Sequence, residues 1–155
     1  MRGLVLLGLI LVLAACGSSG RGKSKSTFAK EANAVCSRYQ KKIDALPPPR
    51  RPSETRPLLD RTIALARQER RALARVRPPR GQRSKFRREL AGRDELLAAF
   101  ANEKDAIVRY TFDVARGRSG KNALRAIAAD LNPRQEKVRR LDEELGLTSC
   151  LNEFR

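Results

Sequence analysis

Three cysteines are the side chains in this 155-residue sequence that are best suited to covalent or metal chemistry: Cys16, Cys36 and Cys150. The sequence contains no histidine. That absence removes the most common general base, every Ser-His-Asp or Cys-His arrangement, and all histidine-based metal sites. The reactions left to the cysteines are acylation, disulfide formation and the binding of a soft metal ion. Which of them applies depends on the compartment in which the chain resides.

The first fifteen residues have the organisation of an export signal. A single basic residue, Arg2, precedes an apolar run from Leu4 to Leu13, which is about half the length that a membrane-spanning helix needs. Ordinary signal cleavage after Ala15 would place the large Leu13 at a position that prefers a small residue. We therefore predict a signal peptide over residues 1–15, with an ordinary cleaved signal and an uncleaved anchor as the alternatives.

The end of this segment, Leu13-Ala14-Ala15-Cys16, resembles the lipobox of bacterial lipoproteins. The resemblance implies that the Cys16 thiol receives a diacylglyceryl group and that Cys16 becomes the first residue of the mature chain. The following residues are rich in glycine, serine and lysine, a composition too polar to pack, so residues 16–26 are predicted to form a flexible tether. The expected location is the extracytoplasmic face of the cell membrane.

Export determines how the two remaining cysteines are interpreted. Disulfides persist in oxidising compartments, so we expect Cys36 and Cys150 to form one, closing a loop of about 115 residues. Two free buried thiols are the alternative. A metal site is a weaker alternative because these two thiols would be its only soft ligands. We therefore expect no metal centre and no cofactor.

Residues 27–155 are predicted to form a single all-α domain. The composition is rich in Ala, Leu, Arg and Glu, and apolar residues recur at steps of three and four. Helices are expected over residues 27–46, 53–77, 84–116 and 121–145. The first helix is expected to end at Pro47-Pro48-Pro49, the second at Pro78-Pro79 and the fourth at Gly146.

Local sequence signals also predict where these helices start and where they are interrupted. Thr27 and Ser53 are the expected N-caps of the first two helices, and Ser84 is the expected start of the third. Gly92-Arg93-Asp94 interrupts the apolar stripe of the third helix, which predicts a kink, a small break or an overhanging end. Asn132-Pro133 predicts a kink or a restart in the fourth helix.

Four amphipathic helices with short connections are expected to pack as an up-down-up-down four-helix bundle. This order would place the connection between the second and third helices, and also the C-terminus, at the end where the first helix begins. Cys150 could then reach Cys36. The arrangement resembles small exported helical proteins of high-GC bacteria, with Cys36 as the early cysteine and Leu145-Gly146-Leu147-Thr148-Ser149-Cys150 as the closing Leu-Gly-Leu-x-x-Cys segment. That resemblance implies a helical fold and a disulfide, and it implies no active site.

The sequence is strongly basic, with 34 Lys and Arg residues against 17 Asp and Glu residues. Eleven basic residues lie between Arg67 and Arg93, where the acids are Glu69 and Glu89. In the expected bundle this segment surrounds the turn nearest the tether and faces an anionic envelope surface. The residues predicted to contact that surface are Arg75, Arg77, Arg80, Arg83, Lys85, Arg87 and Arg88. A solvated surface that is basic for compositional reasons alone is the alternative.

The other motifs argue against catalysis and against nucleic-acid binding. Acidic clusters such as Asp142-Glu143-Glu144 are expected on a solvated, salt-bridged helix face. Ser119-Gly120-Lys121 lacks the first glycine, the following hydroxyl and the preceding strand of a phosphate-binding loop. The sequence contains no recognisable nucleic-acid-binding motif.

These observations predict a lipid-anchored, non-catalytic envelope protein on the extracytoplasmic side of the membrane. Its partners are expected to be an anionic envelope polymer, lipid headgroups or an envelope protein, bound through the basic face. The alternative is a helical bundle that binds a soluble ligand in a cleft between its helices.

Overall fold

The computed structural model describes residues 23–151, which form helices and turns with no strand among them. The helices are α1 (Lys25–Asp44), α2 (Thr55–Leu73), α3 (Arg83–Ala115) and α4 (Lys121–Leu145), with short 3-10 turns η1 (Pro52–Glu54) and η2 (Arg80–Gln82) before α2 and α3. The predicted all-α class and the four helices are confirmed. The expected signal peptide and Cys16 lie outside the described residues.

The first two helices do not start at the caps that the sequence predicts. α1 begins at Lys25 because Ser24, not Thr27, is its N-cap: the Ser24 hydroxyl accepts a hydrogen bond from the Thr27 N–H at 3.1 Å. The helix therefore includes the last two residues of the predicted tether. α2 begins at Thr55, after η1, and no described side chain caps it, so Ser53 is not its cap.

The end of α4 agrees with the sequence expectation, and the end of α2 comes earlier than expected. α4 ends at Leu145 as predicted, and Gly146 adopts the left-handed conformation that the cap requires, with φ of 75°. α2 ends at Leu73, four residues before the predicted end at Arg77. The chain leaves the helix early, and Val76 packs against the buried cluster of apolar side chains around Leu73. Beyond Leu73 the N–H groups of Arg75 and Val76 donate to the carbonyls of Ala72 and Leu73, so a tighter 3-10 turn continues the chain to Val76, directly before Arg77-Pro78.

Both predicted interruptions lie within continuous helix. α4 passes through Pro133 without the expected restart, although proline removes one helical hydrogen bond. Leu131 and Val138, on either side of Pro133, are buried in one apolar cluster with residues of α3, so packing holds both halves together. α3 is likewise unbroken at Gly92, where an added Cβ would lie 3.1 Å from the Val138 side chain. Gly92 therefore permits a close approach of α3 and α4.

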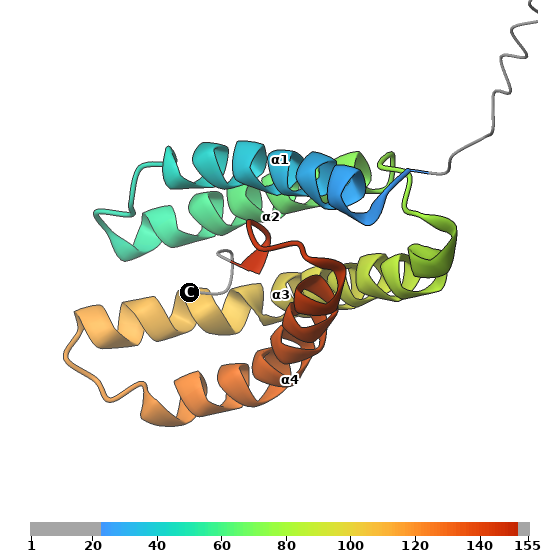
Figure 1. Cartoon of the computed structure of the whole chain (residues 1–155). Helices are drawn as coiled ribbons and strands as arrows, with labels where there is room; N and C mark the ends of the chain where they lie inside the picture. The colour runs from blue at the N-terminus through green and yellow to red at the C-terminus, as the bar shows by residue number, and fades with distance from the viewer. Residues whose placement is uncertain (1–22, 152–155) are drawn as a thin grey trace, which may run out of the picture.

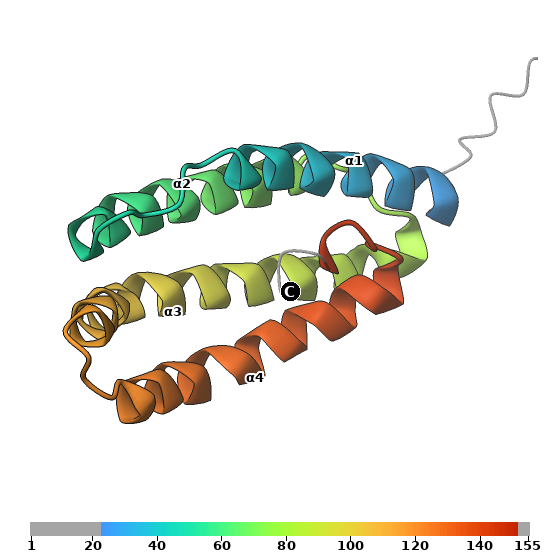
Figure 2. The ribbon, with the colours of Figure 1, turned by 90° about the vertical axis from the view of Figure 1, so that its left-hand side faces the viewer.

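The helices pack in chain order. Figures 1 and 2 show each helix running opposite to the one before it, with α1 beside α2 and α3 beside α4. The extensive contacts between long helices join α1 to α2, α2 to α3, and α3 to α4. The C-terminal turn, residues 146–150, docks on α1: Asn33 donates to the Gly146 carbonyl at 3.0 Å and accepts from the Ser149 N–H at 2.8 Å.

Two apolar clusters form the core. The first joins α1, α2, α3, the last residue of α4 and the C-terminal turn, and within it the Phe28 and Phe86 rings meet edge to face with centroids 5.0 Å apart. Its buried members are Phe28, Ala32, Cys36, Leu73, Phe86, Leu145, Leu147 and Cys150. The second cluster joins α3 to α4 through Leu96, Ala99, Ile127, Leu131 and Val138.

The predicted disulfide is confirmed. Cys36 of α1 and Cys150 of the C-terminal turn are bonded, with Cα atoms 5.1 Å apart and both residues fully buried. The bond joins the middle of α1 to the C-terminal turn inside the first apolar cluster.

Replacing both cysteines, as Cys36→Ala with Cys150→Ala, should lower the free energy of unfolding by up to about 4 to 5 kcal/mol, because the bond closes a loop of about 115 residues. Urea unfolding of the wild-type and variant chains measures the difference. A reductant should bring the wild-type midpoint down towards that of the variant and leave the variant unchanged. Equal midpoints for the two oxidised chains would contradict a stabilising role for the bond.

Candidate functional site

A cluster of buried charged side chains lies between the two apolar clusters. Its centre is Arg93 of α3, which binds Glu69 of α2 at 3.4 Å, Asp142 of α4 at 2.9 Å and Glu89 of its own helix. The Arg93 side chain is 7% exposed, and those of Glu89 and Asp142 are fully buried. One guanidinium therefore connects three helices in the interior of the fold.

The planar guanidinium group explains why arginine occupies this position. It carries five N–H donors in a rigid fork, so it can donate to several carboxylates at once, which a lysine ammonium does with less directional fit. Glu89 precedes Arg93 by one helical turn and lies on the same face of α3. Phe86 and Leu96, one turn before and after this pair, are buried. The charged pair thus occupies core-facing positions of the helix.

Sequence reasoning missed this cluster. Asp142 was expected on a solvated face and is instead fully buried. Glu69, Glu89 and Arg93 were counted within the basic surface segment and are also buried. The sequence does contain a signal for two of these residues. Glu89 and Arg93 stand at the positions where the apolar stripe of α3, from Phe86 to Leu96, would place buried side chains.

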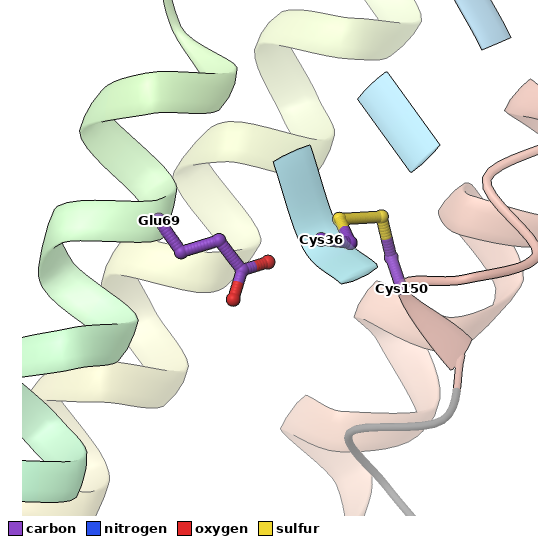
Figure 3. Close-up of side chains that lie close together, drawn as sticks. All are labelled: Cys36, Glu69 and Cys150. Atoms are coloured by element: carbon purple, nitrogen blue, oxygen red, sulfur yellow. A yellow bond between two sulfur atoms is a disulfide. The ribbon is translucent and has the colours of Figure 1, made fainter. Parts of the chain in front are cut away.

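The carboxylate of Glu69 also lies beside the disulfide. Figure 3 shows it pointing towards the bonded sulfur atoms of Cys36 and Cys150, and a carboxylate oxygen and the two sulfurs all lie within 4.8 Å of one another. Thiolates, not disulfide sulfurs, are the form of cysteine that binds metal ions. In the oxidised protein this close approach is therefore packing between the charged cluster and the disulfide.

The arginines of the predicted basic surface are exposed and gather at one end of the fold. Arg75 and Arg77 follow α2, Arg80 lies in η2, and Arg83, Arg87 and Arg88 lie in the first two turns of α3. Figures 1 and 2 both show the connection between α2 and α3 at the end where α1 begins. We call this surface, formed by the six arginines, the basic end.

Lys85 differs from these arginines. It is half-buried and forms an ion pair with Glu144 of α4 at 2.5 Å. The hydrogen bond and charge of Lys85 lower the pKa of the Glu144 carboxyl, so the glutamate is ionised and offsets the lysine charge. Since Glu69 and Glu89 are buried, the arginines of the basic end retain their charge without acidic neighbours from their own segment.

A cavity of about 190 Å³ lies between the four helices. Its wall is mainly apolar and includes Ile63 of α2 together with Leu96 and Phe100 of α3. Gln40 of α1 and Gln135 of α4 also line it. Glu69 and Arg93 border it as well, so the cavity lies next to the charged cluster.

Comparison with known proteins supplies no relative for this site. The chain matches no protein-family model, no curated protein and no solved structure. None of the described helices is both long enough and apolar enough to cross a bilayer.

Replacing Arg93 by methionine should lower the free energy of unfolding by about 3 to 5 kcal/mol, because three buried carboxylates lose the counter-charge that binds them. Chemical denaturation measures this loss. Arg87→Met is the matched control: it removes the same charge from an exposed position of the same helix and should change stability by less than about 0.5 kcal/mol. Equal effects of the two substitutions would show that the buried ion pairs do not stabilise the fold.

Proposed function

We propose that this protein is a lipid-anchored, non-catalytic protein of the extracytoplasmic membrane face, and that its basic end binds the anionic lipid headgroups of the membrane holding its anchor. The observation that carries the proposal is the shared location of six exposed arginines and the start of α1. In this proposal Cys16 carries the lipid, and the four helices form an up-down-up-down bundle with its basic end towards the membrane.

The length of the proposed tether supports this orientation. With α1 beginning at Lys25, the segment from Cys16 to Ser24 has about nine residues, and a Gly/Ser-rich coil of that length spans roughly 17 Å. The arginines would then lie close to the headgroups, where screening by salt extends over only about 8 to 10 Å. Each basic residue near an anionic membrane surface contributes on the order of 1 kcal/mol of attraction.

The burial of the segment's acids also supports the proposal. Glu69 and Glu89 would repel anionic headgroups if they were exposed, but both bind Arg93 in the interior. Lys85 is paired with Glu144 and is therefore expected to contribute less than the arginines. The proposed binding residues are thus Arg75, Arg77, Arg80, Arg83, Arg87 and Arg88, with Lys85 as a secondary contributor.

The lipid anchor is tested by metabolic labelling with a clickable fatty acid in a bacterium that processes lipoproteins. The wild-type chain should carry the label and sediment with membranes, and Cys16→Ser should lose the label and leave the membrane fraction. The double variant Cys36→Ala with Cys150→Ala should keep the label, since only Cys16 is proposed to be acylated. A Cys16→Ser chain that still carried the label and stayed with the membranes would contradict the assignment of the anchor to Cys16.

The basic end is tested with a chain of residues 17–155, which retains both apolar clusters, the charged cluster and the disulfide. It should bind vesicles that contain anionic lipid, dissociate from them as the salt concentration rises, and not bind neutral vesicles. A quadruple variant should bind at least tenfold more weakly, because about four favourable contacts are lost. Its substitutions are Arg80→Gln, Arg83→Gln, Arg87→Gln and Arg88→Gln.

The matched control places Gln at four exposed arginines of the opposite end, Arg50, Arg51, Arg116 and Arg125. It removes the same charge and should bind nearly as well as the wild type. Equal weakening by both quadruple substitutions would show that binding follows net charge alone, and it would overturn the assignment to the basic end.

A further inference from the structure

The cavity between the four helices has the size of a single aromatic ring. Its volume is about 190 Å³, and apolar cavities of about 150 Å³ hold a benzene molecule. Ile63 of α2 and Leu96 of α3 lie in its wall and are at most 9% exposed. Protein interiors are close-packed and contain few voids larger than a water molecule. An apolar occupant of about six carbon atoms would give this part of the fold the usual packing density.

The described residues end beside this cavity. Figures 1 and 2 show the C-terminal turn between the α1–α2 pair and the α3–α4 pair, and the cavity is lined by residues of the same four helices. Within the turn, the Cys150 sulfur lies within 4.8 Å of a carboxylate oxygen of Glu69 (Figure 3). Glu69 also lines the cavity. Leu151 is half-buried, so the chain is still in contact with the fold at this point.

Four residues follow Leu151 in the sequence and lie outside the described residues: Asn152, Glu153, Phe154 and Arg155. Phe154 is the apolar residue among them, and its side chain is a single six-carbon ring. An extended chain advances about 3.3 to 3.6 Å per residue. The Cα atom of Phe154 therefore lies within about 11 Å of that of Leu151.

The wall of the cavity is within this reach. Ile63 and Ala66 precede Glu69 on α2 by six and three residues, and all three line the cavity. At a rise of 1.5 Å per residue, Ile63 lies about 9 Å from Glu69 along the helix axis. Since Cys150 lies beside Glu69, the residues that follow it are long enough to carry the Phe154 ring to this wall.

The polar part of the wall fits a peptide segment. Gln135 of α4 lines the cavity and is half-buried. Its amide has both donors and an acceptor, as a backbone peptide group has, so it can bind the main chain that carries an inserted ring. The Gln40 amide already donates to the Asp44 carboxylate at 2.6 Å, and the Thr62 hydroxyl donates to the Leu58 carbonyl at 3.0 Å.

We propose that the side chain of Phe154 fills this cavity and that residues 152–155 thereby close it to small molecules from solution. The cavity is then a latent site for one apolar ring, which opens when the C-terminal segment is displaced. The inference is independent of the proposed function, because neither the cavity nor the segment that fills it contains an arginine of the basic end.

The contact is tested directly by NMR on the chain of residues 17–155. The ring protons of Phe154 should give nuclear Overhauser effects to the methyl groups of Ile63 and Leu96, which a ring in solvent does not give. A mixture of isotope-labelled and unlabelled chains shows whether the ring belongs to the same molecule. Absence of these effects, or effects between different chains only, would overturn the proposal.

Removing the ring should open the cavity. Phe154→Ala should raise the equilibrium constant for unfolding at least tenfold, because a ring is lost from an apolar site. It should also bind toluene at least tenfold more tightly than the wild-type chain, measured by saturable shifts of the amide NMR signals of Ile63 and Leu97. Asn152→Ala is the matched control in the same segment and should change neither property. Equal stability or equal toluene binding of the Phe154→Ala and wild-type chains would contradict the proposal.

A substitution in the wall should have opposite effects with and without the ring. Ala66→Leu introduces three carbon atoms into the cavity. In the Phe154→Ala chain it should fill the vacated space and lower the equilibrium constant for unfolding, whereas in the wild-type chain it competes with the ring and should raise that constant. Changes in the same direction in both chains would show that Phe154 and Ala66 do not share the cavity, and would overturn the assignment.

Discussion

The interaction of Arg93 with three buried carboxylates is the constraint on which the arrangement of this fold depends. Glu69, Glu89 and Asp142 come from α2, α3 and α4, so the guanidinium sets the relative positions of three helices at one level of the structure. A buried charge is tolerated only when it is paired. The helices α2, α3 and α4 therefore cannot slide or rotate at this level without losing the ion pairs. The fourth helix, α1, is joined at the same level by the disulfide beside Glu69.

The same interaction shapes the surface. Glu69 and Glu89 are the acids of a segment otherwise dense in arginine, and binding to Arg93 removes both from solvent. The arginines of the basic end are therefore left without nearby anions from that segment. Glu69 and Glu89 therefore have two effects. They bind Arg93 in the interior, and their absence from the surface removes negative charge that would weaken an attraction to anionic headgroups.

The features follow a fixed order along the molecule. The basic end comes first, followed by the first apolar cluster with the disulfide, the charged cluster, and then the cavity with the second apolar cluster at its side. This order follows from α3, whose successive turns carry Arg83, Phe86, Glu89, Arg93 and Leu96. A molecule held by its basic end against a membrane would keep the cavity on the side of the charged cluster that faces away from the lipid.

Much of the secondary structure was determined by the sequence itself, because its signals are local. Apolar spacing located all four helices, Gly146 ended α4 at the predicted residue, and Cys36 and Cys150 were paired correctly. The tertiary structure decided the continuity of α4 through Pro133 and the burial of Arg93. The physical reason is the same in each case. A proline within a helix or a buried charge is stabilised by partners on other helices, and those partners become neighbours only when the chain has folded.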